Sequence, residues 1–228
     1  HIVDRTILAD ALHQHGELEV AAERFEEAER MQVQSQPDYP LLYSVQGCRY
    51  CDRLLAGAER AAWRCGGRLS SRGGETADSR VGLRDGLQAC DEVAQRAAQT
   101  LEWAEQYRVS LLDIALDHLT LARCALYRAL LQGEPSHAAQ ADLDRAVDDL
   151  RASGNQDDIP RGLLTRAWLR YSLNDPEGAE ADLTEAQQIA ERGNMRLYLA
   201  DIHFTRARLF RDSVELAKAR ELIKECEY

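Results

Sequence analysis

The sequence predicts an all-α fold, built as a right-handed α-solenoid of about five helix-turn-helix pairs. The composition is helical, because Leu, Ala, Glu and Arg dominate while only 5 of the 228 residues are proline and 6% are aromatic. Two phrases resemble each other, ALDHLTLAR at 115–123 and ADIHFTRAR at 200–208. Small residues also recur at matching places along the chain. Together these observations predict a single repeat domain over residues 1–228.

The first helix pair is expected over residues 4–35. Leu8, Ala9 and Leu12 lie on one face of a helix that Gly16 ends. The next helix carries small, bulky and small residues in turn, at Ala21, Phe25 and Ala28. Because small residues let two helices approach closely, this pattern predicts a tightly packed pair.

The same pattern predicts four more pairs, at residues 38–106, 109–153, 158–193 and 195–227. Their second helices repeat the small, bulky, small positions: Ala97, Leu101, Ala104; Ala139, Leu143, Ala146; Ala179, Leu183, Ala186; and Ala219, Ile223, Cys226. The close-packing residues of the five first helices are Ala9, Gly47, Ala122, Ala167 and Ala207. Asp175 before Pro176 is typical of a helix start. Gly154 and Gly193 stand where second helices are expected to end.

Residues 66–86 do not fit this pattern. They contain six glycines, few large apolar side chains and no helical periodicity. We expect a flexible insertion inside the second pair. A partner-binding loop is the alternative.

The helix-turn-helix pattern of residues 8–28 resembles the tetratricopeptide (TPR) repeat, whose consensus has a small residue in the first helix and Ala, a bulky residue and Ala in the second. The phrases YPLLYSVQGCRYCDRLL, RAAQTLEWAEQ, LLDIALDHLTLAR and MRLYLADIHFTRARLF are similar to the helical-repeat tails of bacterial signalling ATPases of the NACHT and NB-ARC type. The resemblance covers residues 8–226 and consists of packing phrases, so it carries over no catalytic residue. It implies a sensor or scaffold arm, with an upstream nucleotide-binding ATPase domain outside this sequence.

Two histidines occupy equivalent positions in the repeats. His118 and His203 each precede the small residue of their helix by four positions. In TPR units this position holds a bulky side chain between the paired helices, so we expect each imidazole to pack there and to hydrogen-bond to a neighbouring helix. A zinc site needs three or four protein ligands, which the sequence does not assemble, and we expect no metal, no cofactor and no catalytic role.

The six cysteines are interpreted as structural thiols. Cys48 and Cys51 have the spacing of a zinc or redox pair, but they lie on one apolar helical stripe with Leu41, Val45 and Leu55. No second pair of this spacing occurs in the sequence. A four-cysteine metal site and redox sensing remain as alternatives.

The first helices of a solenoid line its inner surface. The positions one and four residues after the small residue are expected to face this groove, and Tyr127 adjoins them. The predicted binding residues are Arg123, Leu126, Tyr127, Trp168, Tyr171, Arg208 and Arg211. Arg, Trp and Tyr carry much of the binding energy at protein interfaces. The alternative is that these arginines pair with acids of neighbouring repeats, with Asp117 and Asp201 at hand.

Charge and motifs exclude several function classes. The net charge of −11, from 39 acidic and 28 basic residues, argues against nucleic acid or an anionic membrane as the main partner. The sequence has no run of 18 apolar residues and no visible signal peptide, and its six cysteines are typical of reduced cytosolic thiols, so we expect a cytoplasmic protein. Phosphate-loop, nucleophile-elbow and HExxH motifs are absent from it, and we expect no enzyme activity. The sequence predicts a scaffold or sensor that binds a peptide or protein in the concave groove. The alternative is a structural or self-assembly element that uses the convex face or the last repeat.

Overall fold

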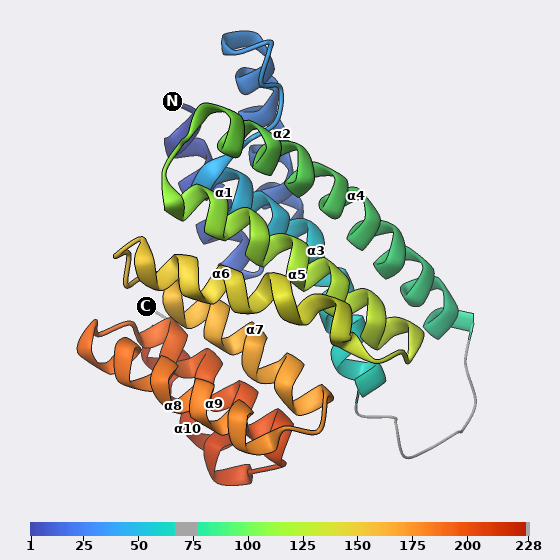
Figure 1. Cartoon of the computed structure of the whole chain (residues 1–228), viewed down its shortest axis with the longest axis vertical. Helices are drawn as coiled ribbons and strands as arrows, with labels where there is room; N and C mark the ends of the chain where they lie inside the picture. Colours follow the sequence, from blue (N-terminus) through green and yellow to red (C-terminus); the bar gives the residue numbers. More distant parts are fainter. Residues whose placement is uncertain (67–76, 227–228) are drawn as a thin grey trace. The chain divides into compact units, whose positions relative to one another are not determined.

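A computed structural model describes residues 1–66 and 77–226, and every regular element within these ranges is helical (Figure 1). The elements are α1 (Ile2–His15), α2 (Leu18–Ser35), α3 (Ser44–Gly66), α4 (Ala77–Tyr107), α5 (Leu111–Gln132), the 3-10 turn η1 (Ser136–Ala139), α6 (Gln140–Ala152), α7 (Ile159–Ser172), α8 (Pro176–Arg192), α9 (Arg196–Phe210) and α10 (Ser213–Cys226). The predicted all-α class is therefore confirmed.

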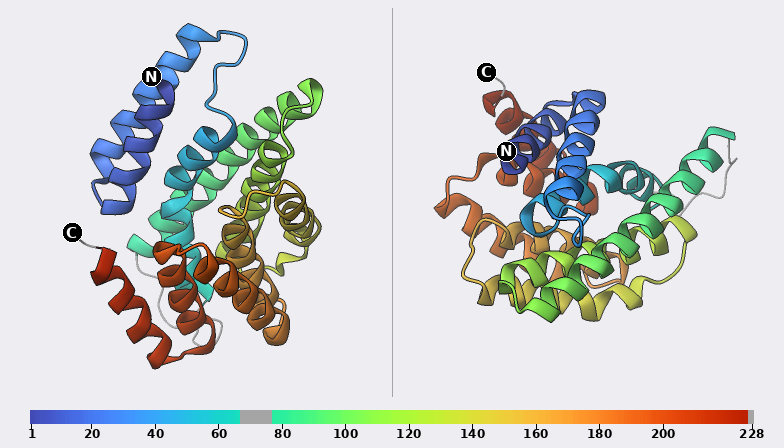
Figure 2. Two further views of the ribbon diagram at one scale, coloured as in Figure 1. Left: turned by 90° about the vertical axis from the view of Figure 1, so that its left-hand side faces the viewer. Right: turned by 90° about the horizontal axis from the view of Figure 1, so that it is seen from above.

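The chain divides into two compact units, His1–Glu134 (unit 1) and Pro135–Tyr228 (unit 2). In unit 1, α1 packs on α2 and α3, and α5 packs on both α3 and α4. Figure 2 shows α1 and α2, in blue, running side by side. In unit 2, α6 packs on α7, α7 on α8 and α9, and α9 on α10.

Four of the five expected pairs match packed consecutive helices: 4–35 (α1 and α2), 38–106 (α3 and α4), 158–193 (α7 and α8) and 195–227 (α9 and α10). The expected third pair, 109–153, begins with α5 in unit 1 and ends with α6 in unit 2. The single right-handed solenoid of about five TPR-like repeats stays a prediction.

The small residues predicted at helix contacts lie in the core. Ala9, Ala122 and Ala167 have no exposed surface, and Ala207 is 8% exposed. Three of the bulky positions of the second helices, Phe25, Leu143 and Leu183, are buried as well, and Leu101 is partly buried. The last copy departs from the pattern, because Ile223 on α10 is 45% exposed.

Two helix ends form as the sequence predicts. The Asp175 side chain accepts a 2.9 Å hydrogen bond from the Gly178 amide and caps the start of α8. Gly154 follows the end of α6 with a left-handed backbone, at φ 74°. After α8 the left-handed residue is Asn194, at φ 51°, rather than Gly193. Asparagine tolerates this conformation better than most other side chains, so the left-handed residue that ends α8 lies one position later than predicted.

The expected flexible insertion differs from the observed structure over residues 77–86, which form the first turns of α4. A Cβ at Gly86 would lie 3.4 Å from the Cα of Ala58 on α3. This glycine therefore allows a close approach of α4 to α3 rather than interrupting the helix. Residues 67–76 of the expected insertion lie outside the described residues.

Within the described ranges, no helix has both the length and the apolar character that crossing a bilayer requires.

Candidate functional site

The seven predicted groove residues separate into a buried set and an exposed set. The buried set is Arg123, Leu126 and Tyr127 on α5 and Trp168 on α7. The exposed set is Tyr171 on α7 with Arg208 and Arg211 at the end of α9.

Arg123 is held inside unit 1. It is 8% exposed, and its guanidinium forms ion pairs with Asp52 and, at 3.3 Å, with Glu59, both on α3. Its Nε also donates a 3.1 Å hydrogen bond to the hydroxyl of Tyr127. These contacts tie α5 to α3, and they correspond to the structural alternative stated for the arginines. The acids that pair with Arg123 come from α3 rather than from Asp117.

The exposed set lies on unit 2. Tyr171 is 39% exposed, and its ring meets that of Phe210 edge to face at a centroid distance of 5.4 Å. The Arg208 guanidinium lies 3.9 Å from the centroid of the Phe204 ring. Arg211 is exposed and follows α9 with a left-handed backbone. These three side chains are the part of the predicted groove that a ligand can reach.

Both histidines lie in the core, as expected for packing residues. His203 is 8% exposed, and its Nδ1 lies 2.6 Å from a carboxylate oxygen of Glu215 on α10. This contact confirms the expected hydrogen bond from that position to a neighbouring helix. His118 is 6% exposed on α5.

Four of the cysteines, Cys48, Cys51, Cys90 and Cys124, are buried in unit 1 as free thiols. Burial raises the pKa of Cys90 to about 11 and that of Cys124 to about 12, and it places the pKa of Cys51 well above the usual value. These three side chains are therefore protonated thiols at neutral pH. Among residues 1–66 and 77–226, no three His, Cys, Asp or Glu side chains gather in a way that would hold a metal ion.

A pocket of about 490 Å³ lies at one end of unit 1. The connection between α2 and α3, the last turns of α4 and the first turns of α5 form its walls, and Figure 1 shows these three segments at the same end of the unit. We call it the Tyr39 pocket. The lining residues that concern its chemistry are Asp38, Tyr39, Trp103, Tyr107, Asp113 and Asp117.

Three aromatic rings form one wall of the Tyr39 pocket. The Tyr39 ring meets the Trp103 ring edge to face at a centroid distance of 5.3 Å, and it meets the Tyr107 ring in the same way at 5.6 Å. A hydrogen bond with Tyr107, together with burial, raises the pKa of Tyr39 to about 12. The Tyr39 ring is therefore uncharged at neutral pH.

Two carboxylates face the same space from α5. Asp113 and Asp117 are four residues apart, so they lie on one face of the helix. The Ser44 hydroxyl donates to Asp113, and the Thr100 hydroxyl donates to Asp117 at 2.8 Å. Burial raises the pKa of Asp117 to about 7; the bond from Thr100 opposes this shift, and the charge of Asp113 adds to it.

The connection that carries Tyr39 is braced by buried polar groups. The Gln32 side-chain amide donates to the Tyr39 carbonyl at 3.0 Å, and the Leu42 amide donates to Glu29 at 3.1 Å. Gly47 on α3 lies directly against this segment, because a Cβ there would be 2.4 Å from the Leu42 carbonyl oxygen. The aromatic wall is therefore held in place before any ligand arrives.

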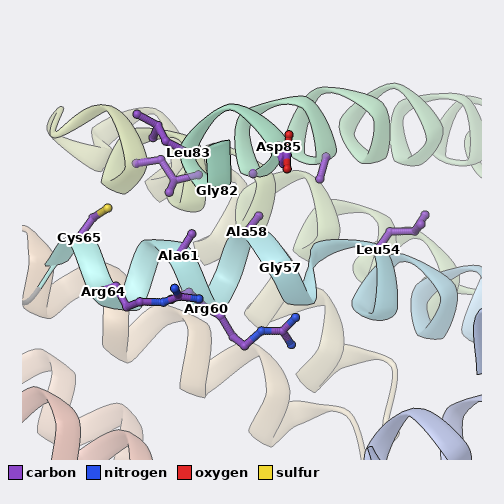
Figure 3. A pocket seen from close by; sticks show the side chains of 13 residues that line it. Leu54, Gly57, Ala58, Arg60, Ala61, Arg64, Cys65, Gly82, Leu83 and Asp85 are labelled. Carbon is purple, nitrogen blue, oxygen red and sulfur yellow. The ribbon is translucent and has the colours of Figure 1, made fainter. Parts of the chain in front are cut away.

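A second pocket, of about 460 Å³, lies between α3 and α4 (Figure 3). Small residues such as Gly57, Ala61 and Gly82 leave this space open. Figure 3 shows Arg60 and Arg64 on the side of α3 that faces away from Asp85 on α4. Because these charged groups do not converge, the Tyr39 pocket is the stronger candidate site.

The Tyr39 pocket is not among the sites that the repeat pattern predicts. Its residues do leave a signal, since Trp103 and Tyr107 are four residues apart on one helix, as are Asp113 and Asp117 on the next. Each spacing places both members on one helical face. Comparison of the chain with known protein families, with curated proteins and with solved structures found no match.

Proposed function

We propose that this chain is a TPR-like helical-repeat module that binds a protein or peptide, with the Tyr39 pocket as its recognition site in unit 1. The observation that carries the proposal is the convergence of three aromatic rings and two carboxylates on one space of about 490 Å³. Ligand sites combine apolar walls with a few convergent polar groups in pockets of this size. Tyrosine and tryptophan are also the residues that most often dominate binding at protein interfaces.

Helix pairing supports the repeat part of this proposal. Consecutive helices pack as pairs in both units, with alanines at the contacts. The exposed residues Tyr171, Arg208 and Arg211 offer unit 2 a second contact surface, for a ligand other than the peptide that the Tyr39 pocket binds. The resemblance to the tails of signalling ATPases suggests that the module acts as the scaffold or sensor arm of a larger bacterial protein. In such a protein a nucleotide-binding domain upstream of the module would respond to the bound partner.

Self-assembly is the second candidate function. Ile7 and Leu8 on α1 are each 50% exposed, and Val214 on α10 is 62% exposed. Exposed apolar side chains favour association between copies. Analytical ultracentrifugation tests this function, because an Ile7→Lys, Leu8→Lys variant that stays associated to the same extent would exclude α1 as the interface.

A selection from a displayed library of random peptides tests the main proposal. The whole chain is the bait, and the affinity of each selected peptide is then measured for the wild type and for the Tyr107→Ala and Tyr171→Ala variants. Both tyrosines are exposed, one at the Tyr39 pocket and one in unit 2. We expect Tyr107→Ala to remove binding and Tyr171→Ala to preserve it. Recovery of no peptide, or of peptides indifferent to Tyr107→Ala, would contradict the role of the pocket.

A further inference from the structure

Among the described residues, the Tyr39 pocket is lined by acids that no basic side chain pairs with. Asp38, Asp113 and Asp117 are among its lining residues, whereas no Lys, Arg or His is among the described residues that line it. In the described part of the chain, neither Asp113 nor Asp117 has a basic side chain within ion-pair distance; their side-chain partners are the hydroxyls of Ser44 and Thr100.

Other enclosed acids of this protein are paired with a cation. Asp182 forms a bidentate pair with Arg166, at 2.7 and 3.0 Å. Glu29 pairs with Arg96, and Glu215 pairs with Lys218 at 2.7 Å. Burying a carboxylate without a cation is unfavourable. The two acids on α5 are partly buried and lack such a cation, so a positively charged group is complementary to the site that they form.

The aromatic wall has the same preference. The face of an aromatic ring carries negative charge density and attracts cations, most strongly for tryptophan and tyrosine. Tyr39, Trp103 and Tyr107 present such rings beside the carboxylates. The rings also cover the aliphatic stem of a long basic side chain, which is apolar. Aromatic walls and an acidic floor together match a group that is apolar along its length and positive at its tip.

We propose that the Tyr39 pocket binds the side chain of a lysine or arginine presented by a protein partner. In this arrangement Asp113 and Asp117 hold the positive tip from α5. The rings on α4 and on the connection before α3 enclose the stem. The inference rests on the proposed protein-binding function and specifies the chemistry of its ligand.

Four capped tripeptides of the form acetyl-Gly-X-Gly-amide test this inference, with X as lysine, norleucine, arginine or citrulline. Norleucine keeps the aliphatic stem of lysine without the ammonium group, and citrulline keeps the length of arginine without the charge. Titration of the whole chain is followed by the Trp103 indole signal in NMR spectra, assigned with Trp103→Phe. We expect the charged peptides to shift this signal and the neutral ones to bind at least about tenfold more weakly, as for the loss of one charged hydrogen bond.

Asp117→Asn provides the matched variant, because the amide oxygen still accepts from Thr100 while the charge is lost. We expect this substitution to weaken binding of the lysine tripeptide at least about tenfold. Glu105→Gln removes the same charge from an exposed position on α4 outside the lining, and binding should be unchanged. If Asp117→Asn does not fold, Asp113→Asn takes its place. Equal binding of all four peptides, absence of binding at millimolar concentration, or indifference to the loss of the carboxylate would overturn the inference.

The two proposals fail in different ways. Library peptides that need Tyr107 but contain no basic residue would preserve the protein-binding function and exclude the cation. Conversely, if the lysine tripeptide shifts the Trp103 signal but no longer peptide from the library needs Tyr107, the cation site would be established and recognition of a peptide beyond that one side chain would be excluded.

Discussion

The hydroxyl of Thr100 on α4 donates a 2.8 Å hydrogen bond to the carboxylate of Asp117 on α5. Thr100 is 4% exposed, so this bond forms in the interior of unit 1, beside the Tyr39 pocket. It joins the helix that supplies Trp103 and Tyr107 to the helix that supplies the acids. The two halves of the proposed cation site are thereby kept at a fixed separation.

Replacing Thr100 with valine keeps the shape of the side chain and removes the donor. Because the bond from Thr100 lowers the pKa of Asp117, we expect that pKa to rise further above about 7. The free energy of unfolding should fall by about 1 kcal/mol. Carboxyl ¹³C NMR titration and urea unfolding measure the two effects. Thr100→Ser retains the hydroxyl and should resemble the wild type; an unchanged Asp117 pKa in the valine variant would show that the bond is not formed.

Two glycines on α3 offer a matched pair of substitutions. Gly47→Ala places a Cβ 2.4 Å from the Leu42 carbonyl oxygen, so the connection that carries Tyr39 must move. We expect a loss of about 1–3 kcal/mol of stability and weaker binding of the lysine tripeptide. Gly57→Ala meets no atom within 4 Å and should stabilise the helix by about 0.5–1 kcal/mol. Thermal unfolding distinguishes them, and equal effects of the two substitutions would contradict the close contact at Gly47.

Glu215 makes unit 2 sensitive to acid. Burial by itself raises the pKa of this carboxyl, but hydrogen bonds with Lys218 and His203 together outweigh it and lower the pKa to about 2. A carboxyl whose pKa is lower in the folded state stabilises the fold above its unfolded pKa, here about 4.5, and this contribution is lost as the pH falls towards 2. We expect Glu215→Gln to lower the free energy of unfolding by about 2 kcal/mol at pH 7. The reduction should become progressively smaller as the pH falls from about 5 to about 2.

Urea unfolding at several pH values measures this difference between Glu215→Gln and the wild type. Glu221→Gln, at an exposed position of the same helix, is the control and should have little effect at any pH. A cost of Glu215→Gln that stays constant from pH 7 to pH 3 would mean that the ionised pair does not form.

The buried and exposed arginines of the predicted groove should behave differently. Arg123→Ala removes a cation that pairs with Asp52 and Glu59, so we expect a loss of about 3 kcal/mol of stability. Arg208→Ala, at an exposed position, should change stability by less than about 0.5 kcal/mol. Chemical denaturation measures both. Comparable effects of the two substitutions would contradict the structural role of Arg123.

Helical periodicity and small-residue spacing predicted the all-α class and the packing of consecutive helices as pairs, because both follow directly from how two helices pack. The boundaries of four pairs agree with the observed helices to within a few residues, apart from the late start of α3. The same rules placed Arg123 and Leu126 in an open groove. They failed there because α5 packs on both α3 and α4, which covers the face that a simple stack would leave open.

The repeat pattern could not predict the Tyr39 pocket, for a different reason. Tyr39 lies in the connection between two pairs, which the repeat pattern does not describe. Its contact with Trp103 joins residues 64 positions apart and depends on the bracing of that connection by Gln32 and Glu29. The spacing of Asp113 and Asp117 shows a shared helical face, but only the fold shows what faces it.

The pKa of the Asp117 carboxyl, measured by NMR with and without the lysine tripeptide, tests the cation site most directly. The other titratable groups that line the pocket are Tyr39, Tyr43, Tyr107, Asp38 and Asp113, and Cys51 on α3 interacts electrostatically with Asp117. Because a bound cation favours the ionised carboxylate, we expect the pKa to fall from about 7 by at least about one unit and the affinity to rise between pH 6 and pH 8. A bound peptide that leaves the Asp117 pKa unchanged would contradict the account.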